Sequence, residues 1–129
     1  VDIEPSKAQL LNFINDIRYK SGDEIFITTG VKTPKILTNI ISAIDDDKVR
    51  LIESLNFTQL ETIVSNSKLL ISCHGAISHV ASAYNIRQID IIDINNQNPY
   101  ENWTHHFRNY HSLYRKKFSI LSSEISNLL

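Results

Sequence analysis

Glycine is scarce in this sequence, with three residues among 129. The dinucleotide-binding pattern GxGxxG and the P-loop pattern GxxxxGK[ST] are both absent. Each pattern needs glycines at fixed spacings, because the backbone must approach phosphate groups closely. The scarcity of glycine therefore argues against an ordinary NAD-dependent enzyme and against a phosphotransferase driven by a nucleoside triphosphate.

Cysteine is nearly absent too, and Cys73 is the single residue of its type. An internal disulfide is therefore excluded, which fits a reducing compartment. No apolar run reaches the roughly 18 residues that a membrane-spanning helix needs, and the start VDIEPSKAQ lacks the pattern of a signal peptide. We therefore expect a cytoplasmic protein.

Neither positive nor negative charge is in clear excess, because the formal net charge is −1. A nucleic-acid-binding domain usually carries a strongly basic face. We therefore expect no nucleic-acid partner.

Hydrophobic residues alternate between two periods along the chain. Helical spacing is found near residues 10–17, 37–44, 57–64, 77–84 and 118–128. Short apolar runs typical of strands lie at residues 24–30, 49–55, 68–73 and 87–93. Pro5 and Gly22 bracket the first helix, as start and stop residues do.

Helices that alternate with apolar strands predict an α/β fold with a parallel sheet and right-handed crossovers. We expect a doubly wound, Rossmann-like sheet between two helical layers, in a single domain over residues 1–129. Four strands are few for this class, and the chain begins with a helix and without Met. We therefore interpret the chain as a fragment of a longer protein.

Ligands of open parallel sheets bind beyond the carboxyl ends of the strands. Those ends fall at residues 28–30, 53–54, 73–75 and 93–95, and we expect them to share one edge. The loop Cys73-His74-Gly75 runs into a predicted helix, whose first N–H groups favour an anion. Gly75 would allow close approach of a ligand or a positive φ angle.

Other uses of this loop stay open. Cys73, His74 and His79 are metal-ligand types, but no C-x-x-C, H-x-x-x-H or HExxH spacing is present, so we predict no metal. A Cys73 nucleophile would need an oriented base, and a plain turn is an equally good interpretation of the loop alone.

The segment over residues 53–93 resembles the C-terminal half of glycosyltransferases of the GT-B architecture. It is most similar to glycosyltransferase family 9, the lipopolysaccharide heptosyltransferases. The matching positions are the following: Phe57–Leu60, Ile63, Lys68–Ser72, Gly75, His79, Val80, Ala81, Ala83, Asn85 and Ile86. The sequence departs from the family at Cys73-His74, where the family has an acidic residue. It also has a Gly-to-His spacing of four instead of three, and no Pro after Asn85.

The resemblance implies a bacterial enzyme that transfers a sugar from a nucleotide-diphosphate sugar to a surface-polysaccharide or lipopolysaccharide acceptor, without a cofactor. It implies donor binding by Thr29, Gly30, Glu53, His74, Gly75, Ala76, Ser78 and His79, with His79 stabilising the leaving diphosphate. The acceptor-binding N-terminal half would lie outside this chain. Alternatives are a non-catalytic nucleotide-binding or regulatory module and an epimerase-like enzyme, for which Glu53 and Asp93 are the strand-end carboxylates.

The segment over residues 97–118 is aromatic and basic. We expect a loop with short helices that packs its aromatic side chains on the sheet. Two functional interpretations stay open beside this one. Trp103, His105 or Arg108 could close over the donor, or Arg115–Lys117 could contact an anionic membrane surface from the cytoplasmic side.

Overall fold

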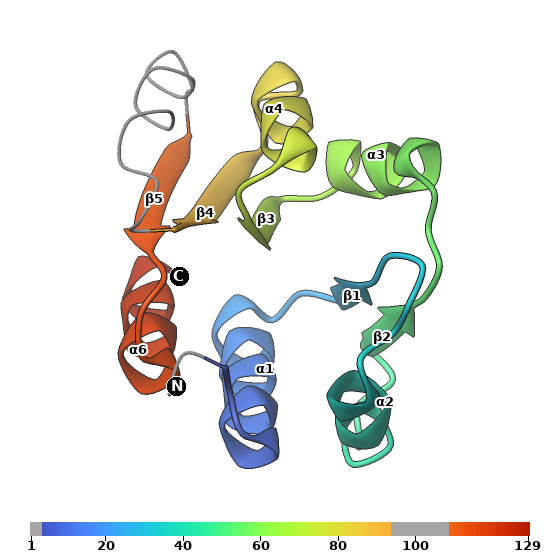
Figure 1. Ribbon diagram of the computed structural model, residues 1–129, viewed down its shortest axis with the longest axis vertical. Coiled ribbons are helices and arrows are strands. Elements are labelled where there is room, and N and C mark those ends of the chain that lie inside the picture. Colours follow the sequence, from blue (N-terminus) through green and yellow to red (C-terminus); the bar gives the residue numbers. More distant parts are fainter. Residues whose placement is uncertain (1–3, 94–108) are drawn as a thin grey trace. The chain divides into compact units, whose positions relative to one another are not determined.

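The computed structural model describes residues 4–93 and 109–129, in which helices and parallel strands alternate (Figure 1). The elements are α1 (Lys7–Ser21), β1 (Ile25–Thr28), α2 (Lys35–Ile41), β2 (Val49–Ile52), α3 (Phe57–Ser65), β3 (Leu69–Cys73), α4 (Ala76–Ala83), β4 (Arg87–Ile92), β5 (Tyr110–Tyr114) and α6 (Phe118–Leu128). The predicted α/β class with parallel strands is confirmed, and the arrangement is Rossmann-like.

The chain divides into two compact units, which are described separately. The first unit comprises Val1–Asn56 and Lys117–Leu129, and the second comprises Phe57–Lys116. The prediction of a single domain over residues 1–129 stays a prediction.

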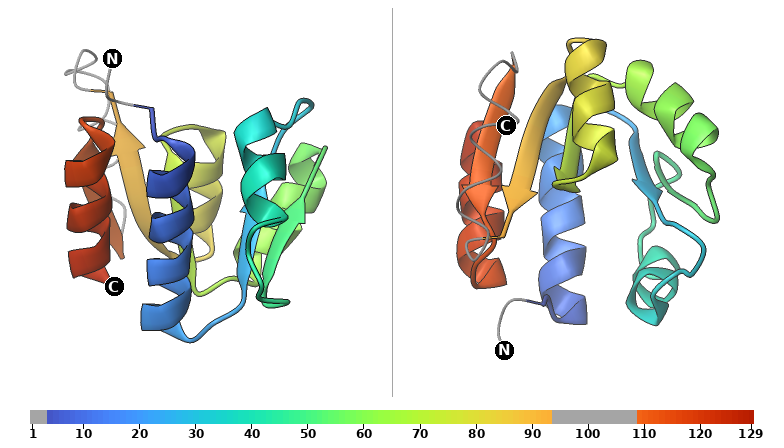
Figure 2. Two further views of the ribbon diagram at one scale, coloured as in Figure 1. Left: turned by 90° about the horizontal axis from the view of Figure 1, so that it is seen from below. Right: turned by 45° about the horizontal axis from the view of Figure 1, so that its top comes forward.

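In the first unit, β1 and β2 pair in parallel from Ile25↔Val49 to Thr28↔Ile52. Helices α1 and α6 lie side by side (Figure 2), and the rings of Phe13 and Phe118 meet edge to face at 5.5 Å. The buried side chains of this unit are Ile14, Ile40, Val49, Leu121 and Ile125. Burial of these branched side chains is the main stabilising contribution in this unit.

Helix α1 lies between Pro5 and Gly22, the two residues that the sequence analysis placed at its ends. Ser6 accepts a hydrogen bond from the Gln9 backbone N–H, and the Gln9 side chain accepts one from the Ser6 N–H, which forms a capping box. Gly22 ends the helix with φ 68°, a left-handed conformation that glycine adopts at little cost.

In the second unit, β3, β4 and β5 form a parallel sheet in that order. Strand β4 is central, and its residues from Gln88 to Asp90 are buried. Helix α4 packs on β4, with α3 beside it. Asn85 has φ 55° between α4 and β4, a conformation that asparagine tolerates better than most residues.

Strand β5 corrects the prediction of a loop with short helices for residues 97–118. Tyr110–Tyr114 pairs in parallel with β4, from Gln88↔Tyr110 to Ile92↔Tyr114. The sequence YHSLY has no apolar run, because the strand has one neighbour within this unit and is largely exposed. Residues 97–108 of the segment, with Trp103, His105 and Arg108, lie outside the described residues.

Candidate functional site

The candidate site lies in the second unit, where β3 ends and α4 begins. The backbone N–H of His74 donates to the carbonyl of Ile91 at 2.9 Å, which continues the β3–β4 ladder one residue beyond the strand. Gly75 follows as the N-cap of α4 with an extended φ of 179°. This backbone hydrogen bond holds the loop against β4. His74 therefore lies at the carboxyl edge of the sheet.

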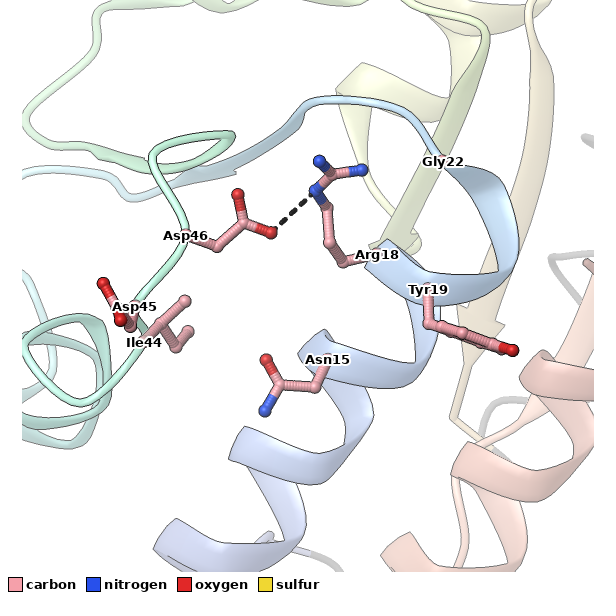
Figure 3. A pocket seen from close by; sticks show the side chains of 7 residues that line it. All are labelled: Asn15, Arg18, Tyr19, Gly22, Ile44, Asp45 and Asp46. Carbon is pink, nitrogen blue, oxygen red and sulfur yellow. Dashed lines mark hydrogen bonds and ion pairs between the residues drawn. The ribbon is translucent and has the colours of Figure 1, made fainter.

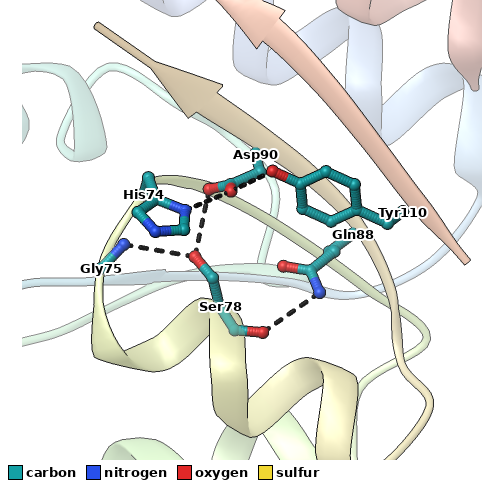
Figure 4. Close-up of polar contacts among 6 residues, drawn as sticks. All are labelled: His74, Gly75, Ser78, Gln88, Asp90 and Tyr110. Atoms are coloured by element: carbon teal, nitrogen blue, oxygen red, sulfur yellow. Dashed lines mark hydrogen bonds and ion pairs between the residues drawn. The ribbon is translucent and has the colours of Figure 1, made fainter. Parts of the chain in front are cut away.

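A buried carboxylate, that of Asp90 in β4, organises this corner of the unit (Figure 4). Asp90 is 0% exposed. Its Oδ2 lies 2.5 Å from Nδ1 of His74 and 2.6 Å from the hydroxyl of Tyr110. Its Oδ1 accepts a hydrogen bond of 3.1 Å from the hydroxyl of Ser78. Side chains of three different segments thus converge on one acidic group.

An isolated carboxylate would be very unstable at such a position, because burial removes its hydration. Here hydrogen bonds from Tyr110 and Ser78 replace water at both oxygens, and the His74 ring adds a third interaction. An ionised carboxylate can only accept hydrogen bonds, so with Asp90 in that form the hydrogen bond is donated by Nδ1 of His74. The other ring nitrogen, Nε2, then lies on the side of the ring away from Asp90.

Ser78 ties the carboxylate to the start of the helix. Its hydroxyl accepts a hydrogen bond from the Gly75 N–H at 3.3 Å, in addition to donating to Asp90. The amide of Gln88 donates to the Ser78 carbonyl at 3.1 Å. Ser78, Gln88 and Asp90 are all buried, so α4 is fixed on β4 by a polar contact that water does not reach.

Some buried polar atoms near this network are unsatisfied. Within the described residues, the Ser72 hydroxyl and Oε1 of Gln88 have no hydrogen-bond partner. The register pairs Ser72 with Asp90, and Gln88 lies two residues before Asp90 on the same strand. Both side chains therefore belong to the sheet face that carries Asp90.

His79 lies in the first turn of α4, and its ring meets that of His74 edge to face, with 5.9 Å between centroids. His79 and Ala76 are exposed, whereas the side chain of His74 is 14% exposed. The structure thus groups the predicted residues His74, Gly75, Ala76, Ser78 and His79 at one helix start. Among these residues, His74 contacts the buried carboxylate of Asp90 through its ring and Ser78 contacts it through its hydroxyl.

Gly75 does not have the positive φ angle that the sequence left open. Its φ of 179° is ordinary extended backbone. A Cβ atom at this position would meet nothing within 4 Å in the part of the chain that is described. The fold therefore does not require glycine here, and close approach of a ligand is the interpretation that stays open.

The other predicted binding residues, Thr29, Gly30 and Glu53, belong to the first unit. The Thr29 N–H donates to the Ile52 carbonyl at 3.2 Å, so the ends of β1 and β2 are adjacent. The Thr29 hydroxyl lies 3.0 Å from that of Thr33, and Glu53 is exposed. Their role in binding stays a prediction.

Sequence reasoning missed Asp90 and Tyr110 as members of the site. A single acid inside the apolar run QIDII is a usable indication, because a buried strand position needs a partner for a carboxylate. Tyr110 gave no comparable indication, since its contact with Asp90 depends on the pairing of β5 with β4.

A pocket of about 560 Å³ lies elsewhere, in the first unit between α1 and the loop after α2 (Figure 3). Arg18 in its wall pairs with Asp46 at 2.9 Å. Tyr19 is 89% exposed and points away from the other lining side chains in Figure 3. None of the residues predicted for binding lines this pocket.

Among the described residues, no group of three or more His, Cys, Asp or Glu side chains could hold a metal ion. No helix within residues 4–93 and 109–129 is long and apolar enough to cross a membrane. No family model matches the sequence, and no curated protein and no solved structure matches it significantly.

Proposed function

We propose that the second unit binds the diphosphate of a nucleotide-diphosphate sugar, and that the chain is the donor-binding domain of a GT-B glycosyltransferase. The observation that carries this proposal is the placement of His74. Its imidazole is held by the buried Asp90 at the start of α4, beyond the carboxyl end of a parallel strand.

The start of α4 is suited to an anion. The first N–H groups of a helix have no partner within the helix, and its dipole favours negative charge. No acidic residue lies in the first turn of α4. When His74 is protonated, it can donate from Nε2 to a phosphate oxygen while Nδ1 donates to Asp90.

The same groups suit sugar transfer. Negative charge develops on the diphosphate as the bond to the sugar breaks, and donors already in place stabilise that charge without reorganising. We assign the main share of this stabilisation to His74, with His79 beside it in the first turn. The polysaccharide or lipopolysaccharide acceptor and the bacterial origin are proposals that the family resemblance supports.

Titration with three nucleoside diphosphates and one monophosphate tests the binding proposal. UDP, GDP, ADP and CMP would be added in turn to isotope-labelled protein while amide NMR signals are followed. We expect one nucleotide to shift the amides of residues 74–80. Any contribution of Thr29, Gly30 and Glu53 is measured by their own amides in the same spectra.

Two variants make this titration specific. Gly75→Ala should leave the fold intact, because the added Cβ has room, yet weaken binding by filling the space at the helix start. His74→Gln should weaken binding about tenfold, as expected for the loss of a charge-assisted hydrogen bond. His111→Gln, a change at an exposed histidine of β5, is the matched control. Absence of binding at millimolar concentration would contradict the proposal and favour a module with another role.

The basic residues after β5 carry a separate proposal. Arg115 lies at the carboxyl edge of the sheet, where its backbone N–H donates to the Ile92 carbonyl at 2.8 Å. We expect Arg115–Lys117 to contact anionic lipid heads. Sedimentation with vesicles containing phosphatidylglycerol, compared with neutral vesicles, tests this contact. Equal partition to both vesicle types would contradict it.

A further inference from the structure

We infer that Asp90 is a positioning residue, which keeps a proton on Nδ1 of His74 and thereby directs Nε2 toward the ligand. The role in ligand binding rests on the proposed function, whereas the position of the proton does not. The first support is geometric. The Asp90 carboxylate lies 2.5 Å from Nδ1, and it is buried while the His74 ring is partly exposed.

The carboxylate itself is immobilised from two further directions. Tyr110 donates to the same oxygen that His74 contacts, and Ser78 donates to the other oxygen. A serine hydroxyl has one hydrogen to donate and two lone pairs that accept. In Ser78 a lone pair accepts from the Gly75 N–H, and the single hydrogen is donated to Asp90. The acceptor that faces His74 therefore cannot rotate away, and the ring orientation is set by the sheet and not by the loop.

With Asp90 at Nδ1, the His74 ring can interact with an anion through Nε2 in either of its protonation states. A protonated ring carries N–H on both nitrogens, one for Asp90 and one for a phosphate oxygen. A neutral ring keeps its proton on Nδ1, so Nε2 is ready to accept a proton when an anion binds. A carboxylate that fixes the tautomer of a histidine in this way is a general device of acid–base sites and metal sites.

The substitution Asp90→Asn separates this role from a structural one. Ser78 needs an acceptor, so the amide oxygen should take the place of Oδ1. The NH₂ group then replaces Oδ2 and faces His74, where it can donate to Nδ1 and to the Tyr110 oxygen. Nδ1 must therefore lose its proton, and the ring becomes the neutral Nε2–H tautomer. The same change of tautomer follows from replacing the aspartate of a Ser-His-Asp triad.

NMR of ¹⁵N-labelled histidine measures the proton position directly, without any nucleotide. In the unchanged protein we expect the proton of the neutral His74 ring on Nδ1, and in Asp90→Asn we expect it on Nε2. The exposed His111 provides an internal reference in every spectrum. An Nε2–H tautomer in the unchanged protein, or a proton that stays on Nδ1 in Asp90→Asn, would overturn the inference.

A double-mutant cycle then tests whether Asp90 acts through His74. We expect Asp90→Asn to weaken binding of the nucleoside diphosphate found in the titration by about tenfold, because a charge-assisted hydrogen bond becomes a neutral one. In the His74→Gln background the same substitution should cause no further loss. An equal loss in both backgrounds would refute the positioning role. If no nucleotide binds at all, the proposed function fails while the histidine spectra still decide the role of Asp90.

Discussion

The hydroxyl of Tyr110 donates a hydrogen bond of 2.6 Å to the carboxylate of Asp90, although the two residues are not register partners. Tyr110 is paired with Gln88, and Asp90 is paired with Ser112. The tyrosine therefore reaches diagonally to the next position on the same face of the sheet, a distance that long aromatic side chains can cover. This contact links the first residue of β5 to the carboxylate that holds His74.

Loss of this hydroxyl should destabilise the second unit. We expect Tyr110→Phe to lower the free energy of unfolding by roughly 1.5–3 kcal/mol, the usual contribution of a hydrogen bond to a charged group. Urea denaturation measures the change. Tyr114→Phe is the matched control, because Tyr114 is 44% exposed and its hydroxyl makes no hydrogen bond within the described residues. Equal losses in the two variants would show that the contact contributes little.

Ser78 should be much more sensitive to substitution than its neighbour on the same helix. Ser78→Ala removes a buried donor to Asp90 and the acceptor of the Gly75 N–H, so we expect a loss of about 1–3 kcal/mol. Ser82→Ala should be neutral or slightly stabilising, because alanine favours helix formation. Hydrogen exchange of the β4 amides locates the effect. Unchanged protection in Ser78→Ala would contradict the prediction.

Gly22 and Gly30 should respond differently to the same change. Gly22 has φ 68°, whereas no positive φ is found at Gly30, and neither has a heavy atom within 4 Å of an added Cβ in the described chain. Gly22→Ala should therefore destabilise by about 1–2 kcal/mol through backbone strain alone. Gly30→Ala should change stability by less than about 0.5 kcal/mol. Thermal unfolding measures the stability of both variants. Equal stability losses in the two variants would contradict a cost from backbone strain at Gly22.

Ile40 should be among the most sensitive hydrophobic positions of the first unit. Its side chain is 0% exposed, while Ile120 of the same unit is 50% exposed. Truncation of Ile40 to alanine should cost about 2–5 kcal/mol, since it combines lost burial with a cavity. Ile120→Ala should cost a small fraction of that. A similar loss of unfolding free energy in the two variants would contradict a central position of Ile40 in the core.

Hydrophobic period and capping residues were sufficient to predict most elements of this chain. The helix that begins after Ser6 and ends at Gly22 depends on contacts between residues a few positions apart. Such local contacts can be read from the sequence. Strand β5 could not be predicted in the same way, because its hydrogen bonds go to β4, roughly 20 residues earlier in the chain.

The candidate site shows the same division between local and long-range information. The sequence by itself determined that His74, Gly75, Ser78 and His79 meet at one helix start, because they lie within one loop and one helical turn. Only the tertiary structure decided that the ring of His74 contacts a buried carboxylate. The Asp90 carboxylate reaches His74 across 16 residues through the pairing of β3 with β4, and Tyr110 completes the network from β5. A buried charge must find its donors in space, and strand pairing sets which residues those are.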